Sequence, residues 1–145
     1  CIRAAYKSQE IIVRNPYSIR PYQHVLEPLY VYLMIAKAQC ENIEFAGYYN
    51  VGPDECDCIT TGDLVDLFCK EWGNGQAWKN VCNQGPHEAQ FLKLDCSKLK
   101  NTFGWGPRWQ ITEAVVKTVE WAKVYEQNDS IVDCMEKQIR LFMLG

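Results

Sequence analysis

The sequence lacks any apolar run of the roughly 20 residues that a membrane-spanning helix needs. Its first residues also lack the charged-then-apolar pattern of a signal peptide. We therefore expect a soluble, cytoplasmic protein. The formal net charge is only −3, and acidic and basic residues are interspersed along the chain. This balance argues against a protein that binds nucleic acid or a membrane surface through bulk charge, so any phosphate-binding site must be local.

Familiar catalytic motifs are absent as well. The chain has no Gly-x-Gly-x-x-Gly fingerprint, P-loop, Gly-x-Ser-x-Gly or His-Glu-x-x-His pattern. No tyrosine is followed four residues later by lysine. We therefore expect the chain to supply binding groups but neither catalytic nor cofactor-binding residues.

The sequence has 8 cysteines and 2 histidines, but their spacing does not suit zinc. Cys56 and Cys58 form a Cys-x-Cys pair, and no paired histidines lie near it. We expect no metal site. Without a secretory signal, we expect reduced thiols, which behave as small hydrophobic side chains in or beside the helices that contain Cys40, Cys69, Cys96 and Cys134.

A length of 145 residues fits one domain, which we place over 1–145 with a C-terminal helical tail over 128–145. The chain starts at Cys1 and is amphipathic from Ile2 onward, so we expect it to be a piece of a longer protein.

Hydrophobic periodicity and turn residues predict short strands that alternate with helices, which indicates a mixed α/β fold. Helices are expected over 1–8, 28–40, 61–72, 96–104, 112–127 and 131–142, and strands over 11–14, 45–51, 77–82 and 91–94. Thr60 and Thr61, Asp95 and Thr112 are the expected N-terminal caps. In helix 28–40, Leu29, Leu33, Ala36 and Cys40 are expected to face the core.

The segment 19–29 concentrates the candidate binding groups, because it places Arg20, Tyr22, Gln23 and His24 between two prolines at the start of a helix. The guanidinium group of an arginine suits phosphate or carboxylate, and Pro21 restricts the backbone that presents it. On residue types alone, a surface turn with solvated or hydrogen-bonded Arg20 and His24 is an equal alternative.

Several segments, taken in order, resemble the C-terminal substrate-binding portion of CDP-glucose 4,6-dehydratases, nucleotide-sugar lyases of the extended short-chain dehydrogenase/reductase family. They are Arg-Pro-Tyr-Gln-His-Val-Leu-Glu-Pro-Leu at 20–29, Tyr-Asn-Val-Gly-Pro-Asp at 49–54, Pro-His-Glu-Ala at 86–89, Leu-Lys-Leu-Asp-Cys-Ser-Lys at 92–98 and Gly-Trp-Gly-Pro-Arg-Trp at 104–109. The resemblance covers nearly the whole chain and weakens after about residue 125.

The resemblance implies an enzyme of deoxysugar biosynthesis that converts CDP-glucose to CDP-4-keto-6-deoxyglucose with tightly held NAD. The NAD-binding and catalytic residues of the family lie in an N-terminal Rossmann portion that this sequence does not contain. The resemblance also implies a homo-oligomer for the full-length enzyme.

Residue by residue, the resemblance assigns Arg20 to the substrate diphosphate, and it places Tyr22, Gln23 and His24 beside the nucleotide or sugar. Related enzymes place a polar pair near the diphosphate or ribose, and the resemblance assigns this place to His87 and Glu88. It implies that Asn50 either holds the nucleotide or braces its loop. Two departures are that relatives usually carry Trp at position 22 and often carry Arg within 83–85. With these departures, neutralisation of the diphosphate charge depends more heavily on Arg20.

Alternatives to this function remain open. The chain could belong to another nucleotide-sugar dehydratase or to a 4-epimerase of the same superfamily. It could also be a non-catalytic binding or oligomerisation module.

Overall fold

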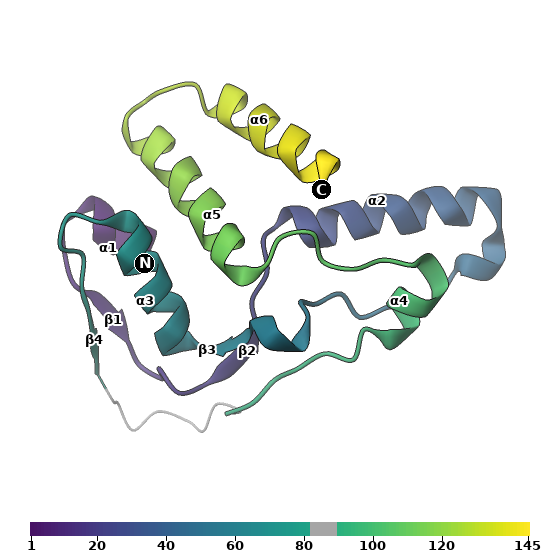
Figure 1. Cartoon of the computed structure of the whole chain (residues 1–145), viewed down its shortest axis with the longest axis horizontal. Helices are drawn as coiled ribbons and strands as arrows, with labels where there is room; N and C mark the ends of the chain where they lie inside the picture. The colour runs from purple at the N-terminus through teal and green to yellow at the C-terminus, as the bar shows by residue number, and fades with distance from the viewer. Residues whose placement is uncertain (82–89) are drawn as a thin grey trace.

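The computed structural model describes residues 1–81 and 90–145 as helices joined to two small sheets (Figure 1). The expected mixed α/β class is therefore confirmed. The helices are α1 (Ile2–Tyr6), α2 (Leu26–Glu41), α3 (Thr61–Trp72), α4 (Ser97–Phe103), α5 (Ile111–Glu126) and α6 (Ile131–Leu144), with 3-10 turns η1 (Ile43–Phe45) and η2 (Glu55–Asp57). The strands are β1 (Ile11–Val13), β2 (Ile19–Pro21), β3 (Cys58–Thr60) and β4 (Trp78–Asn80).

The two sheets have different strand directions. Strands β1 and β4 are parallel, with Ile11 opposite Trp78, whereas β2 and β3 are antiparallel, with Ile19 opposite Thr60. Figure 1 shows that the β2–β3 pair lies between the α1–α3 side of the molecule and the side formed by α2 and α4. This pair therefore carries the segment with the candidate binding residues across the middle of the fold.

The larger hydrophobic core joins α1, β1, α3 and α5. Its buried side chains are Ala5, Ile11, Val13, Val65, Phe68, Trp72, Ile111, Val115, Val119 and Ala122. On α5 the buried positions, which include Val115, Val119 and Ala122, follow the helical period. The hydroxyl of Tyr6 also donates to the Ala122 carbonyl oxygen at 2.6 Å, which ties α1 to α5.

A second, smaller core holds α2 against α4 and the loop that follows α4. It consists of the buried side chains of Val31, Leu99 and Trp105, with partly buried hydrophobic residues around them. Helix α4 ends where the sequence predicts, at Gly104, whose φ of 62° is a left-handed conformation that glycine adopts readily. The C-terminal helix α6 packs on α5, and the side-chain amide of Gln138 donates to the Lys117 carbonyl oxygen at 2.9 Å.

The predicted cap at Thr60 is confirmed, and the predicted cap at Thr112 is wrong. The Thr60 hydroxyl accepts from the Asp63 backbone N–H at 3.1 Å, and the Asp63 carboxylate accepts from the Thr60 N–H at 3.3 Å. Helix α5 begins one residue earlier than expected, so Gln110 occupies the cap position and Thr112 lies in the first turn.

We expect Thr60→Ala to lower the free energy of unfolding by about 1 kcal/mol, because it leaves an N-terminal N–H of α3 without its acceptor. Urea denaturation measures this loss. The matched control is Thr112→Ala, expected to change stability by less than about 0.5 kcal/mol. Equal losses for the two variants would contradict the observed start of α5.

Two predicted strands are wrong. In place of a strand over 45–51, the chain forms η1. The residues that follow it pair with no strand among the described residues. Asn42 stabilises η1 by accepting from the Glu44 N–H at 2.9 Å. The strand expected over 91–94 is reduced to one bridge between Phe91 and Ile19. Conversely, the first part of the predicted turn, Ile19–Pro21, is strand β2.

The prediction of which face of α2 is buried is wrong. Leu29 is 47% exposed and Leu33 73% exposed, and Cys40 is exposed too. The fully buried residues of α2 are instead Glu27 and Val31. In α6, Cys134, Gln138 and Phe142 are buried, whereas Met135 and Ile139 are 47% and 44% exposed.

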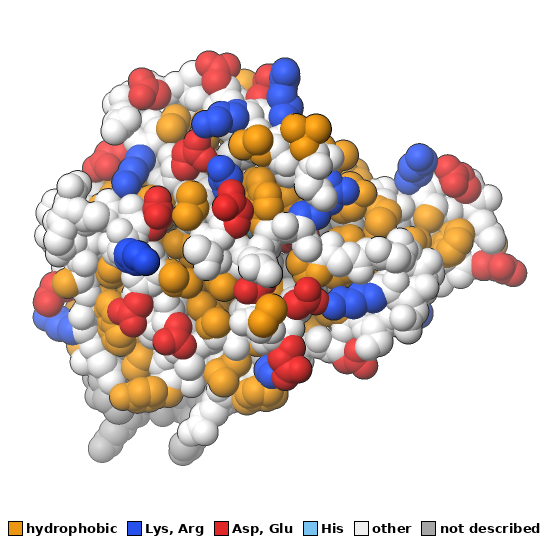
Figure 2. Space-filling view, viewed as in Figure 1, with side chains coloured by type: hydrophobic (Ala, Val, Ile, Leu, Met, Phe, Trp, Pro, Cys, Tyr) orange, Lys and Arg blue, Asp and Glu red, His pale blue; other side chains and the backbone are white. Residues whose placement is uncertain are grey.

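The charge distribution matches the expectation from the sequence. Figure 2 shows acidic and basic side chains intermixed on the viewed face, with hydrophobic side chains between them. Within residues 1–81 and 90–145, no helix is long and apolar enough to cross a membrane. The cysteines in these two ranges are free thiols, and burial raises the pKa of the Cys96 and Cys134 thiols.

Candidate substrate-binding site

The candidate segment turns sharply between strand β2 and helix α2. The Tyr22 N–H donates to the Arg20 carbonyl oxygen at 3.0 Å, and the Glu27 N–H donates to the His24 carbonyl oxygen at 3.0 Å. Because β2 pairs with β3 immediately before this turn, the backbone at Arg20 is fixed by the sheet. The Arg20 side chain is half-buried, and its Nη1 donates to the Ile19 carbonyl oxygen at 2.9 Å.

Tyr22 is anchored at the start of α3. Its hydroxyl lies 2.7 Å from Thr61 Oγ1, which in turn lies 2.9 Å from Ser18 Oγ. The ring packs against the larger core. The Tyr22 side chain therefore stabilises the fold. The other polar groups of the turn belong to Arg20, Gln23 and His24.

Gln23 links the turn to the segment that contains Asn50. Its Nε2 donates to the Val51 carbonyl oxygen at 3.4 Å. Its Oε1 is buried and accepts no hydrogen bond from any described residue. A buried acceptor without a partner is costly, so Gln23 Oε1 keeps an unused capacity to accept a hydrogen bond.

His24 is 8% exposed and packs edge-on against Trp109, with 4.9 Å between the ring centroids. Its Nδ1 accepts from the Leu26 N–H at 3.3 Å, which satisfies a donor at the start of α2. Burial lowers the pKa of His24, and the positive charge of Lys117 lowers it further. The ring is therefore neutral at pH 7, with its proton on Nε2.

Asn50 braces two loops. Its Nδ2 donates to the Asp95 carbonyl oxygen at 3.0 Å, and the Asp95 carboxylate accepts from the Ser97 N–H at 2.9 Å at the start of α4. The Asp95 carboxylate thus satisfies the first N–H of α4, but the N-cap residue is Cys96, so the predicted cap at Asp95 is wrong by one position. Ion pairs between Lys93 and Glu55 and between Lys100 and Asp54 join the same loops.

The structure therefore brings Gln23 close to the Asn50–Val51 segment through a direct hydrogen bond. Tyr22 and His24 belong to the same turn but make separate contacts, at α3 and at Trp109. His87 and Glu88 lie outside the described residues. No cluster of His, Cys, Asp or Glu able to hold a metal ion occurs in 1–81 or 90–145.

Sequence reasoning missed Glu27, which fixes the geometry of this region. The residue is 0% exposed, and its Oε1 accepts from the backbone N–H groups of Arg108 and Trp109 at 2.9 and 2.8 Å. The Arg108 guanidinium lies 4.4 Å from the centroid of Tyr30 and donates to the Phe142 carbonyl oxygen at 2.7 Å. The available signal was an acidic residue between Leu26 and Pro28 in an otherwise apolar helix start.

This chain is 39% identical over 143 residues to CDP-glucose 4,6-dehydratase from Salmonella typhimurium, a match that covers 98% of this chain. The chain is similar to CDP-glucose 4,6-dehydratase. This confirms the resemblance predicted from the motifs, and the similarity lies in the C-terminal part of that enzyme. The chain spans 40% of the length of the Salmonella CDP-glucose 4,6-dehydratase.

A solved structure, UDP-N-acetylglucosamine 4-epimerase from Bacillus cereus, matches the fold with a TM-score of 0.64. The match covers 84% of this chain and 41% of that protein, at 17% sequence identity. At this identity the likeness concerns the fold alone. No family model matches the chain.

Proposed function

We propose that this chain is the substrate-binding part of a CDP-glucose 4,6-dehydratase, which forms CDP-4-keto-6-deoxyglucose and water from CDP-glucose. The observation that carries the proposal is the 39% identity along 98% of the chain. The proposal includes a cytoplasmic location and a homo-oligomeric full-length enzyme, in line with the expectations from the sequence.

In this proposal Arg20 binds the diphosphate of the substrate. Arg20 lies within β2, whose pairing with β3 fixes its backbone, and a guanidinium forms charge-assisted hydrogen bonds with phosphate oxygens. Gln23 Oε1, which lacks a partner among the described residues, accepts from the nucleotide or sugar. Tyr22 and His24 shape the turn through their contacts with Thr61 and Trp109, and the resemblance places them beside the nucleotide or sugar.

The proposal gives Asn50 the bracing role, because its amide already bonds the Asp95 carbonyl oxygen. His87 and Glu88 complete the proposed substrate-binding residues on the strength of the resemblance.

The described residues do not fit NAD, the cofactor that the resemblance implies. A dinucleotide site needs a strand, a glycine-rich turn and a helix N-terminus in succession. In residues 1–81 and 90–145, α3 follows β3 directly through Thr60, and α2 follows β2 through the turn that contains His24. We therefore propose that NAD is bound outside this chain, and we derive no step through it.

Replacing Arg20 by alanine in the enzyme that contains this chain should weaken CDP-glucose binding by about tenfold or more, because a charge-assisted bond to phosphate is lost. Isothermal titration calorimetry measures the affinity. The matched control is Arg14→Ala, an exposed arginine at the end of β1, which should leave the affinity unchanged. An Arg20→Ala variant that binds CDP-glucose as tightly as the parent would remove this role.

The same enzyme distinguishes the alternative functions. Incubation with CDP-, UDP-, GDP- and dTDP-glucose, followed by detection of the 4-keto product, should give product with CDP-glucose. Product from a different nucleotide sugar would indicate another dehydratase, and inversion at C4 without loss of water would indicate an epimerase. If the upstream reading frame lacks both a glycine-rich strand–turn–helix and a Tyr-x-x-x-Lys motif, the chain is a non-catalytic module.

A further inference from the structure

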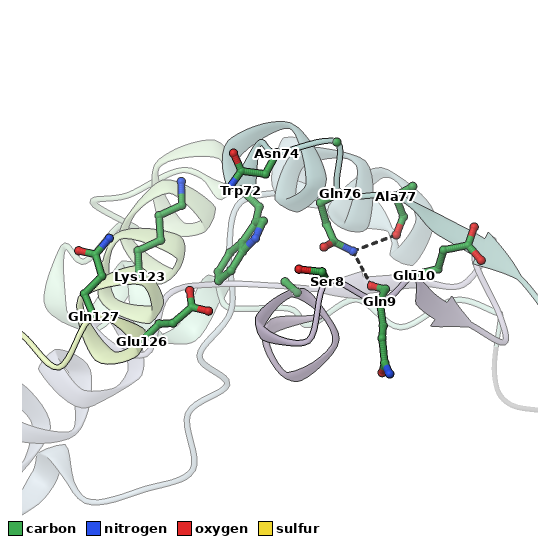
Figure 3. A pocket seen from close by; sticks show the side chains of 12 residues that line it. Ser8, Gln9, Glu10, Trp72, Asn74, Gln76, Ala77, Lys123, Glu126 and Gln127 are labelled. Carbon is green, nitrogen blue, oxygen red and sulfur yellow. Dashed lines mark hydrogen bonds between the residues drawn. The ribbon is translucent and has the colours of Figure 1, made fainter.

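A polar cavity of about 280 Å³ lies where the C-terminal ends of α3 and α5 meet the residues that follow α1 (Figure 3). We call it the α3–α5 pocket. The side chains that matter for its chemistry are Ser8, Trp72, Asn74, Gln76, Lys123 and Glu126. None of its lining residues belongs to the candidate substrate-binding site. The volume is at the lower end of that of small-molecule sites, so it suits a ligand of monosaccharide size.

Trp72 gives the pocket a rigid wall with an available donor. The residue is 6% exposed, and its ring stacks on Phe68 and lies against Tyr6, with centroid distances of 5.5 and 5.6 Å. Figure 3 shows its indole nitrogen on the side of the ring toward Ser8 and Gln76. Among the described residues this N–H has no hydrogen-bond acceptor. A ligand oxygen in the pocket would satisfy it.

Gln76 provides an oriented acceptor on the opposite wall. Its Nε2 donates to the carbonyl oxygens of Gln9 and Ala77 at 2.8 and 3.1 Å, which fixes the amide. The Oε1 atom is therefore left to accept from a ligand. Ser8 holds a hydroxyl nearby on a backbone with a φ of 49°. A hydroxyl both donates and accepts, so the pocket offers both kinds of hydrogen-bonding group.

Charges of both signs line the pocket, so it favours neither kind of ion uniformly. An anion would meet the carboxylates of Glu126 and of Glu10, which pairs with Lys79, and the partial negative charges at the C-terminal ends of α3 and α5. A cation would meet Lys123, whose Nζ lies 5.8 Å from the centroid of Trp72. Lys123 also donates to the Glu71 carbonyl oxygen at 3.1 Å, which stabilises the end of α3 and holds its ammonium group at the edge of the pocket.

We propose that the α3–α5 pocket binds a neutral molecule with several hydroxyl groups, of monosaccharide size. Such a ligand matches mixed donors and acceptors on the walls without adding charge. The proposal does not depend on the function proposed above, because it uses different residues.

The test is a titration of the ¹⁵N-labelled protein with D-glucose, followed through the indole N–H signals of its 5 tryptophans. Trp72→Phe keeps an aromatic ring against Phe68 and assigns the Trp72 signal by its disappearance. We expect the Trp72 signal to shift in a saturable manner. Inorganic phosphate and ammonium chloride, added at the same concentrations, should not produce a saturable shift.

Ser8→Gly should weaken the glucose affinity by about fivefold, since it removes one hydrogen-bonding group. Glycine accepts the positive φ at this position, so the fold is retained. The matched control is Asn128→Gly, at another residue with positive φ (55°) outside the pocket lining, which should bind glucose like the parent. Arg20→Ala should also retain the glucose response, which separates this proposal from the proposed function.

Three results would overturn the proposal: a Trp72 signal that glucose does not shift in a saturable manner, saturation by phosphate or ammonium instead, or equal glucose affinity in Ser8→Gly and the parent.

Discussion

Replacing Glu27 by alanine should lower the free energy of unfolding by about 3 to 5 kcal/mol, because it leaves buried N–H groups without an acceptor. Glu27 Oε1 accepts from both Arg108 and Trp109, on a side chain that is 0% exposed. Its loss would release the loop after α4 from the start of α2. The change also removes a buried side-chain volume that alanine cannot fill.

Urea denaturation of the protein measures the effect, and Glu113→Ala is the matched control. Glu113 lies in the first turn of α5, is exposed and pairs with Lys117 at 3.4 Å. A long i,i+4 ion pair whose carboxylate is exposed contributes between about 0 and 1 kcal/mol, so this variant should remain close to the parent. If Glu27→Ala costs no more than Glu113→Ala, the bonds to Arg108 and Trp109 do not hold the loop.

The contribution of Glu27 should also depend on pH. Burial raises the pKa of Glu27, against the hydrogen bonds from Trp109 and Arg108 and the charge of Arg108, which lower it. Since the folded state then binds this proton more tightly than the unfolded state, the stabilisation is complete below the unfolded pKa of about 4.3. Only this proton-linked part of the stabilisation is lost as the pH rises through the raised pKa of the folded state.

Glu27→Gln cannot titrate, so it isolates this effect. The free energy of unfolding of the parent, relative to Glu27→Gln, should fall as the pH rises from about 4 toward neutrality. Denaturation at a series of pH values measures the difference. A parent that gains stability relative to Glu27→Gln over that range would contradict the raised pKa.

The parts of the fold that the sequence predicts correctly are those with local causes. Helix α3 begins at a Thr60–Asp63 capping box and ends before Gly73, and each of these signals acts within a turn of the helix. Gly104 ends α4 for the same kind of reason. Such features depend on residues a few positions apart, so a single sequence contains them in full.

The failed predictions concern contacts between distant segments. Residues 45–51 have strand-like alternation, but a strand also needs a neighbour, and the described residues offer none there. The face of α2 was assigned from the positions of Leu29 and Leu33, yet burial depends on where α4 and the 104–109 loop pack. These elements meet α2 at Val31 and Glu27 instead.

The candidate site follows the same division. The sequence identifies the residue types of the turn at Arg20, Gln23 and His24, because they are adjacent. It cannot reveal that Gln23 reaches Val51, or that His24 packs on Trp109, since those partners are 28 or more positions away. The bracing role of Glu27 is not visible in the sequence for the same reason, because its partners lie 81 and 82 positions further along the chain.

Leu99→Ala should cost about 3 to 5 kcal/mol of unfolding free energy, the upper part of the range for a leucine truncated in a well-packed core. Leu99 is 0% exposed and packs with Val31 and Trp105, the buried residues of the smaller core. Leu99 is one of the three buried residues of that core, so its truncation removes a large share of the buried contacts that hold α4 against α2. The matched control is Leu33→Ala, also on a helix but 73% exposed, which should cost less than about 1 kcal/mol. Urea denaturation of both variants measures the two losses of unfolding free energy and so shows which face of α2 is packed. Equal losses for the Leu33 and Leu99 variants would support the face predicted from periodicity. The expected difference assigns the packing of α2 to Val31, Leu99 and Trp105.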